Sequence, residues 1–248
     1  LSVFTDNIHT LFGTSMHEVL QEYLKVMYTQ SIKEADQLYL DEQLEDRLKK
    51  NFLEIVKKNG GDEFCTKDQM VEFYEDGLKI LDYFKKKRNQ YFSKRGYELV
   101  GIETALDYGL PKNIKFRGYI DLIIKDTVRN RIKIIDIKTS TMGWNKYQKA
   151  DKNKTDQLLL YKQFYSKQHD IPMDRIEVEY FIVKRKLYEN LDYPQKRIQT
   201  FIPANGKPSI NKVNRRLEAF MDDCFTDSGE YRDDHTYIKQ PSKKNCRW

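Results

Sequence analysis

The sequence predicts an α/β fold with a helical N-terminal part. Up to about Phe92, apolar residues recur at three- and four-residue steps, which is the period of an amphipathic helix. From Tyr97 the period changes to two, which is typical of strands. We therefore expect one domain over residues 1–248, with a helical part at 1–95 and an α/β core at 96–248.

The helical part begins with an amphipathic helix whose buried face carries Leu11, Val19, Leu20 and Leu24. A charged stretch follows from Ser31 to Asn59, where apolar residues are too sparse to predict a deep core. Gly60-Gly61 breaks this stretch. Apolar residues then return at helical spacing and predict a second amphipathic helix, with Met70, Phe73, Tyr74, Leu78, Leu81 and Phe84.

The α/β core is expected to begin with three strands, at residues 97–106, 116–125 and 131–138. The second and third are close enough in sequence to form a hairpin. A polar loop rich in lysine and asparagine follows at 140–154, and Thr155 is expected to cap a helix at 156–167. The remaining expected elements are strands at 176–183 and 198–202 and a closing helix at 211–224.

Composition narrows the class of protein. The net charge is +6, from 44 basic and 38 acidic residues, which suits a polyanionic partner and equally a mildly basic, solvated surface. No apolar run approaches the roughly 18 residues of a membrane span. Leu1 to Asp6 does not read as a signal peptide. Three dispersed cysteines make no disulfide framework, so we expect an intracellular, cytoplasmic protein.

The strongest chemical feature lies in the second and third expected strands. Alternate residues of a strand face the same side, so Asp136 and Lys138 share a face. Asp121 lies in the preceding strand, and the neighbours of all three are mainly apolar. Charged groups in such surroundings are costly unless they are paired or bind a metal.

The hairpin geometry brings the two aspartates together. If the turn centres on Val128-Arg129, Asp121 lies directly opposite Asp136, with Cβ atoms roughly 4.5–5.5 Å apart. A turn shifted by one residue brings Ile123 opposite instead and leaves both carboxylates on one face. Two carboxylates so placed can share one divalent cation, and without it one of them would gain a proton.

These residues predict metal-assisted hydrolysis of a phosphodiester. The Lys138 ammonium can contact the scissile phosphate and orient or help deprotonate the attacking water. A metal lowers the pKa of that water and neutralises developing charge. The alternative is a structural hairpin in which Asp136 and Lys138 form an ion pair, and the Asp-x-Lys triplet alone favours this alternative.

Four short motifs stand in order along the chain: Gly13-x-x-x-His17, Gly118-x-x-Asp121, Asp136-x-Lys138-Thr139 and Gln157-x-x-x-Tyr161. The second and third resemble the core of the PD-(D/E)xK nucleases, and the ordered set resembles their RecB-type exonuclease branch. Each motif is weak singly, whereas the ordered set is fairly specific. The resemblance implies a restriction-endonuclease-like core, with a mixed central sheet flanked by helices. It makes the chain a single nuclease domain whose helical part carries His17.

The resemblance also implies a metal site for Mg²⁺ or Mn²⁺. Its ligands would be His17, Asp121, Asp136 and the backbone carbonyl of Ile137. Glu103 of the first strand is a further candidate ligand, favoured over Glu98. Without the other motifs, His17 would read as a partly buried helix histidine.

Further residues are expected to act around Asp121, Asp136 and Lys138. Gln157 and Tyr161 lie four residues apart on one helix face, and the resemblance implies that they contact the DNA backbone or support catalysis. Packing at the edge of the core is the alternative. Aromatic and cationic side chains suit single-stranded nucleic acid, so DNA contacts are expected from Thr139, Ser140, Trp144, Tyr147, Lys184 and Arg185. An ordinary mobile basic loop and solvated cations are the alternatives there.

The expected function is therefore a metal-dependent DNA nuclease acting on single strands or on duplex ends. By analogy it would be an exonuclease in recombination, repair or phage replication. One alternative is a non-catalytic module that binds DNA ends or single strands on the same fold. Another is a structural protein whose charged pairs lie on the surface.

Some members of the family that this sequence resembles carry an iron–sulfur cluster on four cysteines. The segment Asn245-Cys246-Arg247-Trp248 resembles the opening of a terminal cysteine group. Cys65 and Cys224 are the other cysteines, and three dispersed thiols cannot form a Cys₄ site. We therefore expect no cluster in this chain.

Overall fold

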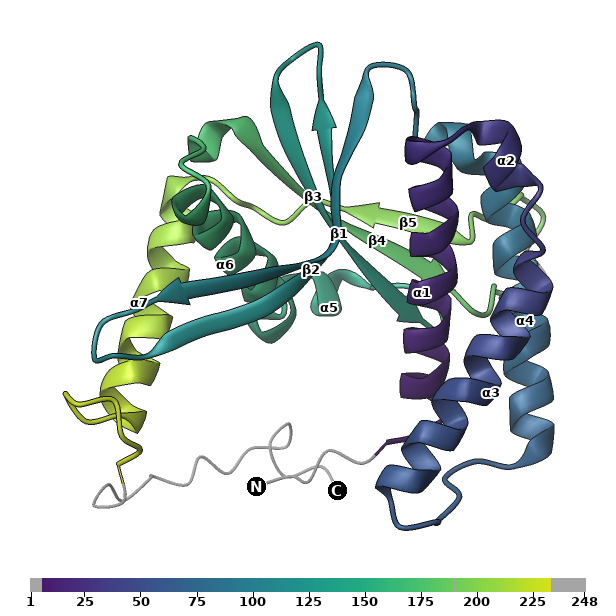
Figure 1. Cartoon of the computed structure of the whole chain (residues 1–248), viewed down its shortest axis with the longest axis horizontal. Coiled ribbons are helices and arrows are strands. Elements are labelled where there is room, and N and C mark those ends of the chain that lie inside the picture. The colour runs from purple at the N-terminus through teal and green to yellow at the C-terminus, as the bar shows by residue number, and fades with distance from the viewer. Residues whose placement is uncertain (1–5, 190, 233–248) are drawn as a thin grey trace.

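The computed structural model describes residues 6–189 and 191–232. Its helices and strands are α1 (Ile8–Thr29), α2 (Ile32–Asp36), α3 (Leu40–Lys58), α4 (Lys67–Lys87), β1 (Tyr97–Gly109), β2 (Lys115–Asp126), β3 (Arg131–Ser140), α5 (Lys146–Ala150), α6 (Lys152–Gln168), β4 (Ile176–Lys184), β5 (Ile198–Phe201) and α7 (Lys207–Cys224). A central sheet separates α1–α4 from α6 and α7 (Figure 1). The predicted α/β fold with a helical N-terminal part is confirmed.

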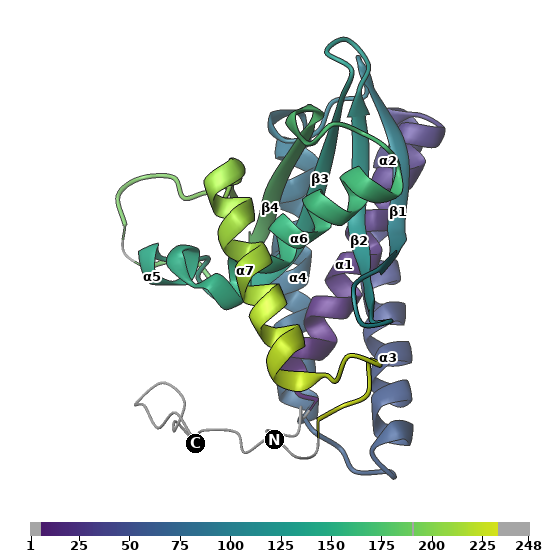
Figure 2. The same ribbon diagram turned by 90° about the vertical axis from the view of Figure 1, so that its left-hand side faces the viewer.

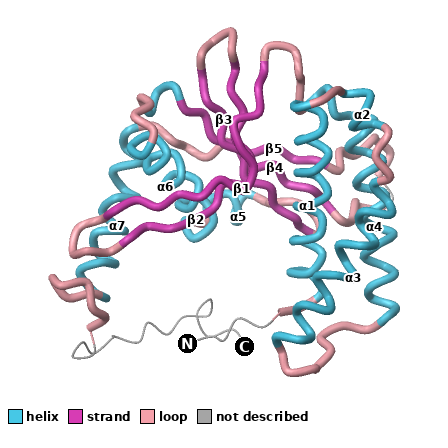
Figure 3. Tube along the Cα trace, viewed as in Figure 1, coloured by secondary structure: helices cyan, strands magenta, loops and turns pink. Residues whose placement is uncertain are grey.

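The sheet has the order β1-β2-β3-β4-β5 and is mixed. Neighbouring strands run antiparallel except β3 and β4, which run parallel. A parallel pair needs a crossover connection, and here α5 and α6 provide it. The strands lie together between the two groups of helices (Figure 3), and α6 and α7 lie side by side on one face (Figure 2).

The β2–β3 pairing stops partway along β2. Paired residues extend from the turn to Leu122, which lies opposite Ile135. This is the register predicted for a turn centred on Val128-Arg129. Beyond that point β2 stays with β1, and the two strands together lead away from β3 toward α7 (Figure 1). The sheet therefore opens into a fork, and Asp121 and Asp136 are the first residues past its last pair.

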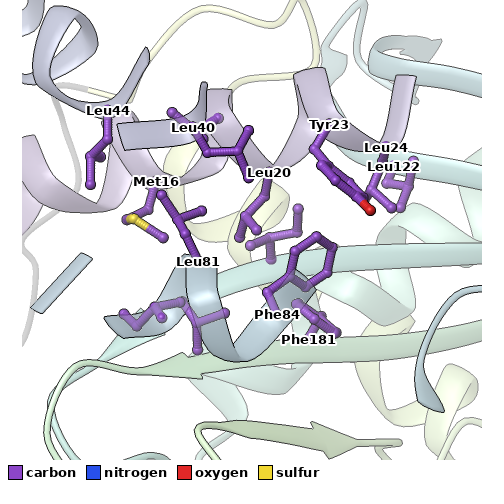
Figure 4. Close-up of a cluster of buried hydrophobic side chains, with 14 of the residues drawn as sticks. Met16, Leu20, Tyr23, Leu24, Leu40, Leu44, Leu81, Phe84, Leu122 and Phe181 are labelled. Carbon is purple, nitrogen blue, oxygen red and sulfur yellow. The ribbon is translucent and has the colours of Figure 1, made fainter. Parts of the chain in front are cut away.

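Two hydrophobic clusters cover the two faces of the sheet, as strand alternation requires. The larger cluster lies between the sheet and the N-terminal helices and takes Leu122, Ile135 and Ile137 from the strands. Figure 4 shows part of it, including Leu20 and Phe84. The second cluster lies toward α6 and takes the intervening residues Ile123 and Ile134. It also takes Ile120, which lies past the fork, where the alternation of β2 shifts by one residue.

The charged stretch before Gly60 contributes more to the core than its composition predicts. It contains α3, and Leu40, Leu44 and Leu48 are buried along one stripe at four-residue spacing. A stripe this narrow is easily missed in a helix rich in charge. The helix then ends at Lys58, where the two glycines break it as predicted.

Two details of the segment before α6 correct the sequence interpretation. Residues 140–154 are not all loop, because Asn145 caps the short helix α5. Thr155 does not cap α6, since the helix begins at Lys152 and Asp151 is its N-cap. The Thr155 hydroxyl is buried and donates to the Asp151 carbonyl instead. Thr155 therefore lies inside the first turn.

No helix in the described part of the chain is both long and apolar enough to cross a membrane. Cys65 and Cys224 are free thiols. Cys246, with the rest of the terminal segment that resembles a cluster motif, lies outside the described residues.

Candidate active site

Asp121 lies at the fork, where its side chain replaces a missing backbone partner. Its Oδ2 accepts the backbone N–H of Ile137 at 2.7 Å. A backbone N–H at the end of a strand pairing needs an acceptor, and the carboxylate supplies it. The carboxylate is thereby held beside β3 in a fixed orientation.

Helix α1 brings an imidazole and an amide to the same point. The Nδ1 atom of His17 lies 3.8 Å from Asp121 Oδ2. Gln21, one turn farther along, donates from Nε2 to Glu103 Oε1 at 2.6 Å and to the Asp121 carbonyl at 3.2 Å. Sequence reasoning missed Gln21, although its four-residue spacing from His17 placed it on the same helix face.

The close approach of α1 to β3 depends on Gly13. A Cβ at this position would lie 3.1 Å from the Oγ1 atom of Thr139. Packing against Thr139 therefore explains Gly13 in the predicted motif Gly13-x-x-x-His17, and the polar contact with Asp121 explains His17. Gly13, His17 and Gln21 form one stripe of α1 that faces the fork.

Glu103 lies across from Asp121, between the paired residues Ile102 and Thr104 of β1. Its backbone has φ 47°, in the left-handed region. A non-glycine residue there costs roughly 1–3 kcal/mol and often marks a functional position. Glu98 instead pairs with Lys125 near the other end of β2. Of the two candidate glutamates, Glu103 is therefore the one at the fork.

Asp136 projects from β3 toward α6 and is buried, at 2% exposed. Lys138 Nζ lies 2.8 Å from Asp136 Oδ2, an ion pair without hydrogen-bond geometry. Lys138 also donates to Gln157 Oε1 at 3.3 Å, and Gln157 Nε2 donates to Tyr161 Oη at 3.0 Å. The four side chains form one chain of contacts from β3 to α6.

Tyr161 also explains the glycine of the second motif. A Cβ at Gly118 would lie 2.8 Å from Tyr161 Cε1, so the ring packs directly on the β2 backbone. Tyr161 is buried there. It therefore ties the outer part of β2 to α6 just beyond the fork.

Burial shifts the ionisation of the site. It raises the pKa of Asp121 to about 6, opposed by the Ile137 N–H and Lys138. Burial also raises the pKa of Asp136 to about 6, opposed by Lys138 and reinforced by the Asp121 charge. For His17, burial and the nearby Lys138 charge lower the pKa to about 4, so the imidazole is neutral at pH 7.

The donor types at the fork fit a divalent cation. Neutral imidazole and carboxylate oxygen are ligands for Mg²⁺ and Mn²⁺. Buried Asp136 Oδ2 has no hydrogen-bond partner within the described part of the chain. A cation would offset the cost of burying two carboxylates. Among the described residues, no three His, Cys, Asp or Glu side chains are grouped as a ready-made metal site. The Lys138 ammonium lies against the Asp136 carboxylate instead.

The aromatic residues predicted to stack on DNA differ in their placement. Trp144 is buried, at 6% exposed, and packs against Tyr180 and Phe201. Its prediction as a stacking residue is therefore wrong, because the indole belongs to the core on the α6 side. Tyr147 is 74% exposed on α5 and remains a candidate.

The polar residues predicted to contact DNA are also placed differently from one another. Arg185, predicted to contact DNA, forms ion pairs with Glu72 and Asp76 of α4, so the alternative of a solvated cation does not hold. Ser140 binds the Gly143 backbone in both directions at 3.1 Å. Thr139 faces α1, and Lys184 is half-buried.

Comparison with known protein families gives a match that spans the residues of this site. A sequence model described as the PD-(D/E)XK nuclease superfamily matches residues 5–247. The matched segment contains all four motifs. A search of curated proteins gives no match of significance. The chain belongs to the PD-(D/E)XK nuclease superfamily.

Proposed function

We propose that this nuclease-family chain is a metal-dependent deoxyribonuclease of the RecB-type branch, acting as an exonuclease on DNA ends or single strands. The observation that supports this best is the fork itself. It gathers Asp121, Asp136 and Lys138 from two strands that part at this point, with His17 beside them. A role in recombination, repair or phage replication is proposed by analogy with the fold.

The metal ligands in this proposal are His17, Asp121, Asp136 and the Ile137 carbonyl, with Glu103 as a further oxygen donor. The ion would be Mg²⁺ or Mn²⁺. When bound, such an ion lowers the pKa of a water molecule and neutralises charge on the phosphate. Gln21 holds both the Glu103 carboxylate and the Asp121 backbone, so it keeps two of the donors together.

Lys138 brings positive charge to the scissile phosphate and orients the attacking water. Gln157 fixes the ammonium through its amide oxygen, and Tyr161 fixes Gln157 in turn. Groups held in advance in a buried site stabilise developing charge more strongly than solvated groups. The hydrogen bond from the Ile137 N–H holds the Asp121 carboxylate in position.

The alternative is a non-catalytic module that binds DNA ends or single strands on the same fold. The intact set of Asp121, Asp136 and Lys138 speaks against it, because simple binding does not need two buried carboxylates. Carboxylates repel the DNA backbone unless a cation neutralises them.

Cleavage assays distinguish these functions. End-labelled linear and circular DNA, each single- and double-stranded, is incubated with EDTA, Mg²⁺ or Mn²⁺. We expect cleavage only with a metal, and resistance of the circles if the chain is an exonuclease. DNA binding without cleavage under every condition would favour the binding module.

Two variants locate the activity. Asp136→Ala is expected to abolish cleavage with the fold intact by circular dichroism. Lys138→Ala should reduce turnover more than DNA affinity. The matched control is Lys133→Ala, also on β3, which loses an ion pair with Glu179 outside the site. Wild-type cleavage by Asp136→Ala would rule out the assigned site.

A further inference from the structure

A cavity of about 150 Å³ lies where β3 ends. Three segments contribute to it: the first turns of α1, the end of β3 with the residue after it, and the residue after β4. Its lining residues are His9, Phe12, Thr139, Ser140, Thr141 and Arg185. We call it the β3-end cavity.

The β3-end cavity adjoins the proposed catalytic centre. Thr139 follows Lys138 directly in β3 and lies against Gly13 of α1. His9 and His17 are eight residues apart on the same helix, which corresponds to about 12 Å along its axis. Gly13 lies between them without a side chain. A chain of phosphates bound along this side of α1 would thus meet both places.

Arg185 gives the cavity a fixed donor. Its Nη1 is held by Glu72 Oε1 at 2.9 Å and by Asp76 Oδ2 at 2.8 Å, and its guanidinium lies 3.9 Å from the Phe73 ring centroid. Its Nε–H is buried and has no hydrogen-bond partner among residues 6–189 and 191–232. A buried donor left unpaired is costly, so a ligand that supplies an acceptor is favoured there.

Hydroxyl groups add to this donor. Within the part of the chain that the structure describes, the Thr139 and Thr141 hydroxyls make no hydrogen bond, whereas Ser140 is engaged by Gly143. None of the six lining residues is acidic. A guanidinium with neighbouring hydroxyls is a donor set that suits an anion, and phosphate in particular.

The surrounding charges also favour an anion. Arg185 and Lys186 both contact Glu72 and Asp76, and Lys79 contacts Asp76 at 3.5 Å. Three cations against two carboxylates leave a net charge of +1. The carboxylates therefore hold Arg185 in place without cancelling the positive charge behind the cavity.

We propose that the β3-end cavity binds a phosphate of the nucleic acid next to the one that is cut. The proposal rests on the proposed nuclease function for its source of phosphate. A phosphate monoester at a strand end and an internal phosphodiester share the chemistry that the cavity recognises. Arg185 Nε and the two threonine hydroxyls donate to the oxygens of this phosphate, while the phosphate that is cut lies at the fork.

The test measures binding without cleavage. Short single-stranded oligonucleotides with a 5′-phosphate, a 3′-phosphate or neither are titrated in Ca²⁺ and followed by fluorescence anisotropy. Arg185→Lys keeps the ion pairs with α4 and removes the Nε donor. Thr139→Val/Thr141→Val removes both hydroxyls with little change in volume. The control is Thr200→Val, an exposed position of β5 outside the cavity.

We expect either test variant to bind about tenfold more weakly, because a hydrogen bond to a charged group typically contributes about that factor. Thr200→Val should bind as the wild type does. A loss confined to one phosphorylated end identifies a terminal phosphate, and an equal loss on all oligonucleotides identifies an internal one. Either result supports the cavity as a phosphate site.

Wild-type affinity in both test variants, with folding verified by thermal melts, would overturn the proposal. This outcome differs from failure of the nuclease function. A chain that binds the oligonucleotides but never cuts DNA would refute the nuclease activity and leave the phosphate site standing. A chain that cuts normally but shows no change in these variants would refute the site alone.

Discussion

The Asp121 carboxylate accepts the backbone N–H of Ile137, a residue 16 positions farther along the chain, at 2.7 Å. This contact substitutes a side chain for a strand partner at the point where β2 leaves β3. It also fixes a buried carboxylate beside Asp136, where burial opposes its charge. Stability and the proposed chemistry are therefore in conflict at the fork.

Asp121→Asn is expected to stabilise the metal-free protein while abolishing cleavage. The amide oxygen can still accept from Ile137, and the buried charge is removed. Because the folded pKa of Asp121 is raised from 3.8 to about 6, its ionisation costs stability. The cost begins above about pH 4 and is complete above about pH 6.

The gain from Asp121→Asn should therefore be about 1–3 kcal/mol at pH 8 and should vanish near pH 4. Urea unfolding in EDTA at both pH values measures it. Glu98→Gln, an exposed acid-to-amide change on β1, serves as the control and should leave the midpoint unchanged. A destabilised Asp121→Asn at pH 8 would contradict this account of the fork.

Divalent metal should stabilise the wild type and not Asp121→Asn. A ligand that binds only the folded state adds about 2.7 kcal/mol at a hundredfold excess over its Kd. Thermal melts with and without Mn²⁺ at pH 8 measure the shift without any DNA. Equal shifts for wild type and variant would show that the ion binds elsewhere.

Gln157→Ala is expected to lower kcat about tenfold with little change in KM, since Gln157 positions Lys138 through a contact of 3.3 Å. In combination with Lys138→Ala it should cause no further loss, because the two residues act as one unit. Steady-state kinetics of both single variants and the double variant provide the test. Additive losses would mean that Gln157 acts independently of Lys138.

Gly118→Ala should destabilise the protein by about 1–3 kcal/mol, because the new methyl would lie 2.8 Å from Tyr161 Cε1. Gly109→Ala is the matched control on the neighbouring strand, since a Cβ there meets no atom of the described residues within 4 Å. Urea midpoints of the two variants give the comparison. A similar midpoint for both would show that Tyr161 moves aside freely.

Local pattern was sufficient to predict the fold class and the shared face of Asp136 and Lys138, and it left two alternative β2–β3 registers, of which the structure has the first. Each depends on residues close in sequence: helical spacing, strand alternation and the turn at Val128-Arg129. Local pattern failed for Thr155, because the helix started at the stronger cap Asp151, one turn earlier.

Only the tertiary structure decided which groups surround those residues. The parting of β2 from β3, the reach of Gln21 to Glu103 and the burial of Trp144 all depend on segments distant along the chain. Likewise, the sequence left Arg185 open as either a DNA contact or a solvated cation, and only the fold shows that Asp76 holds it. A sequence encodes its periodicities locally, whereas the partner of a charged or aromatic side chain is chosen only when distant elements pack.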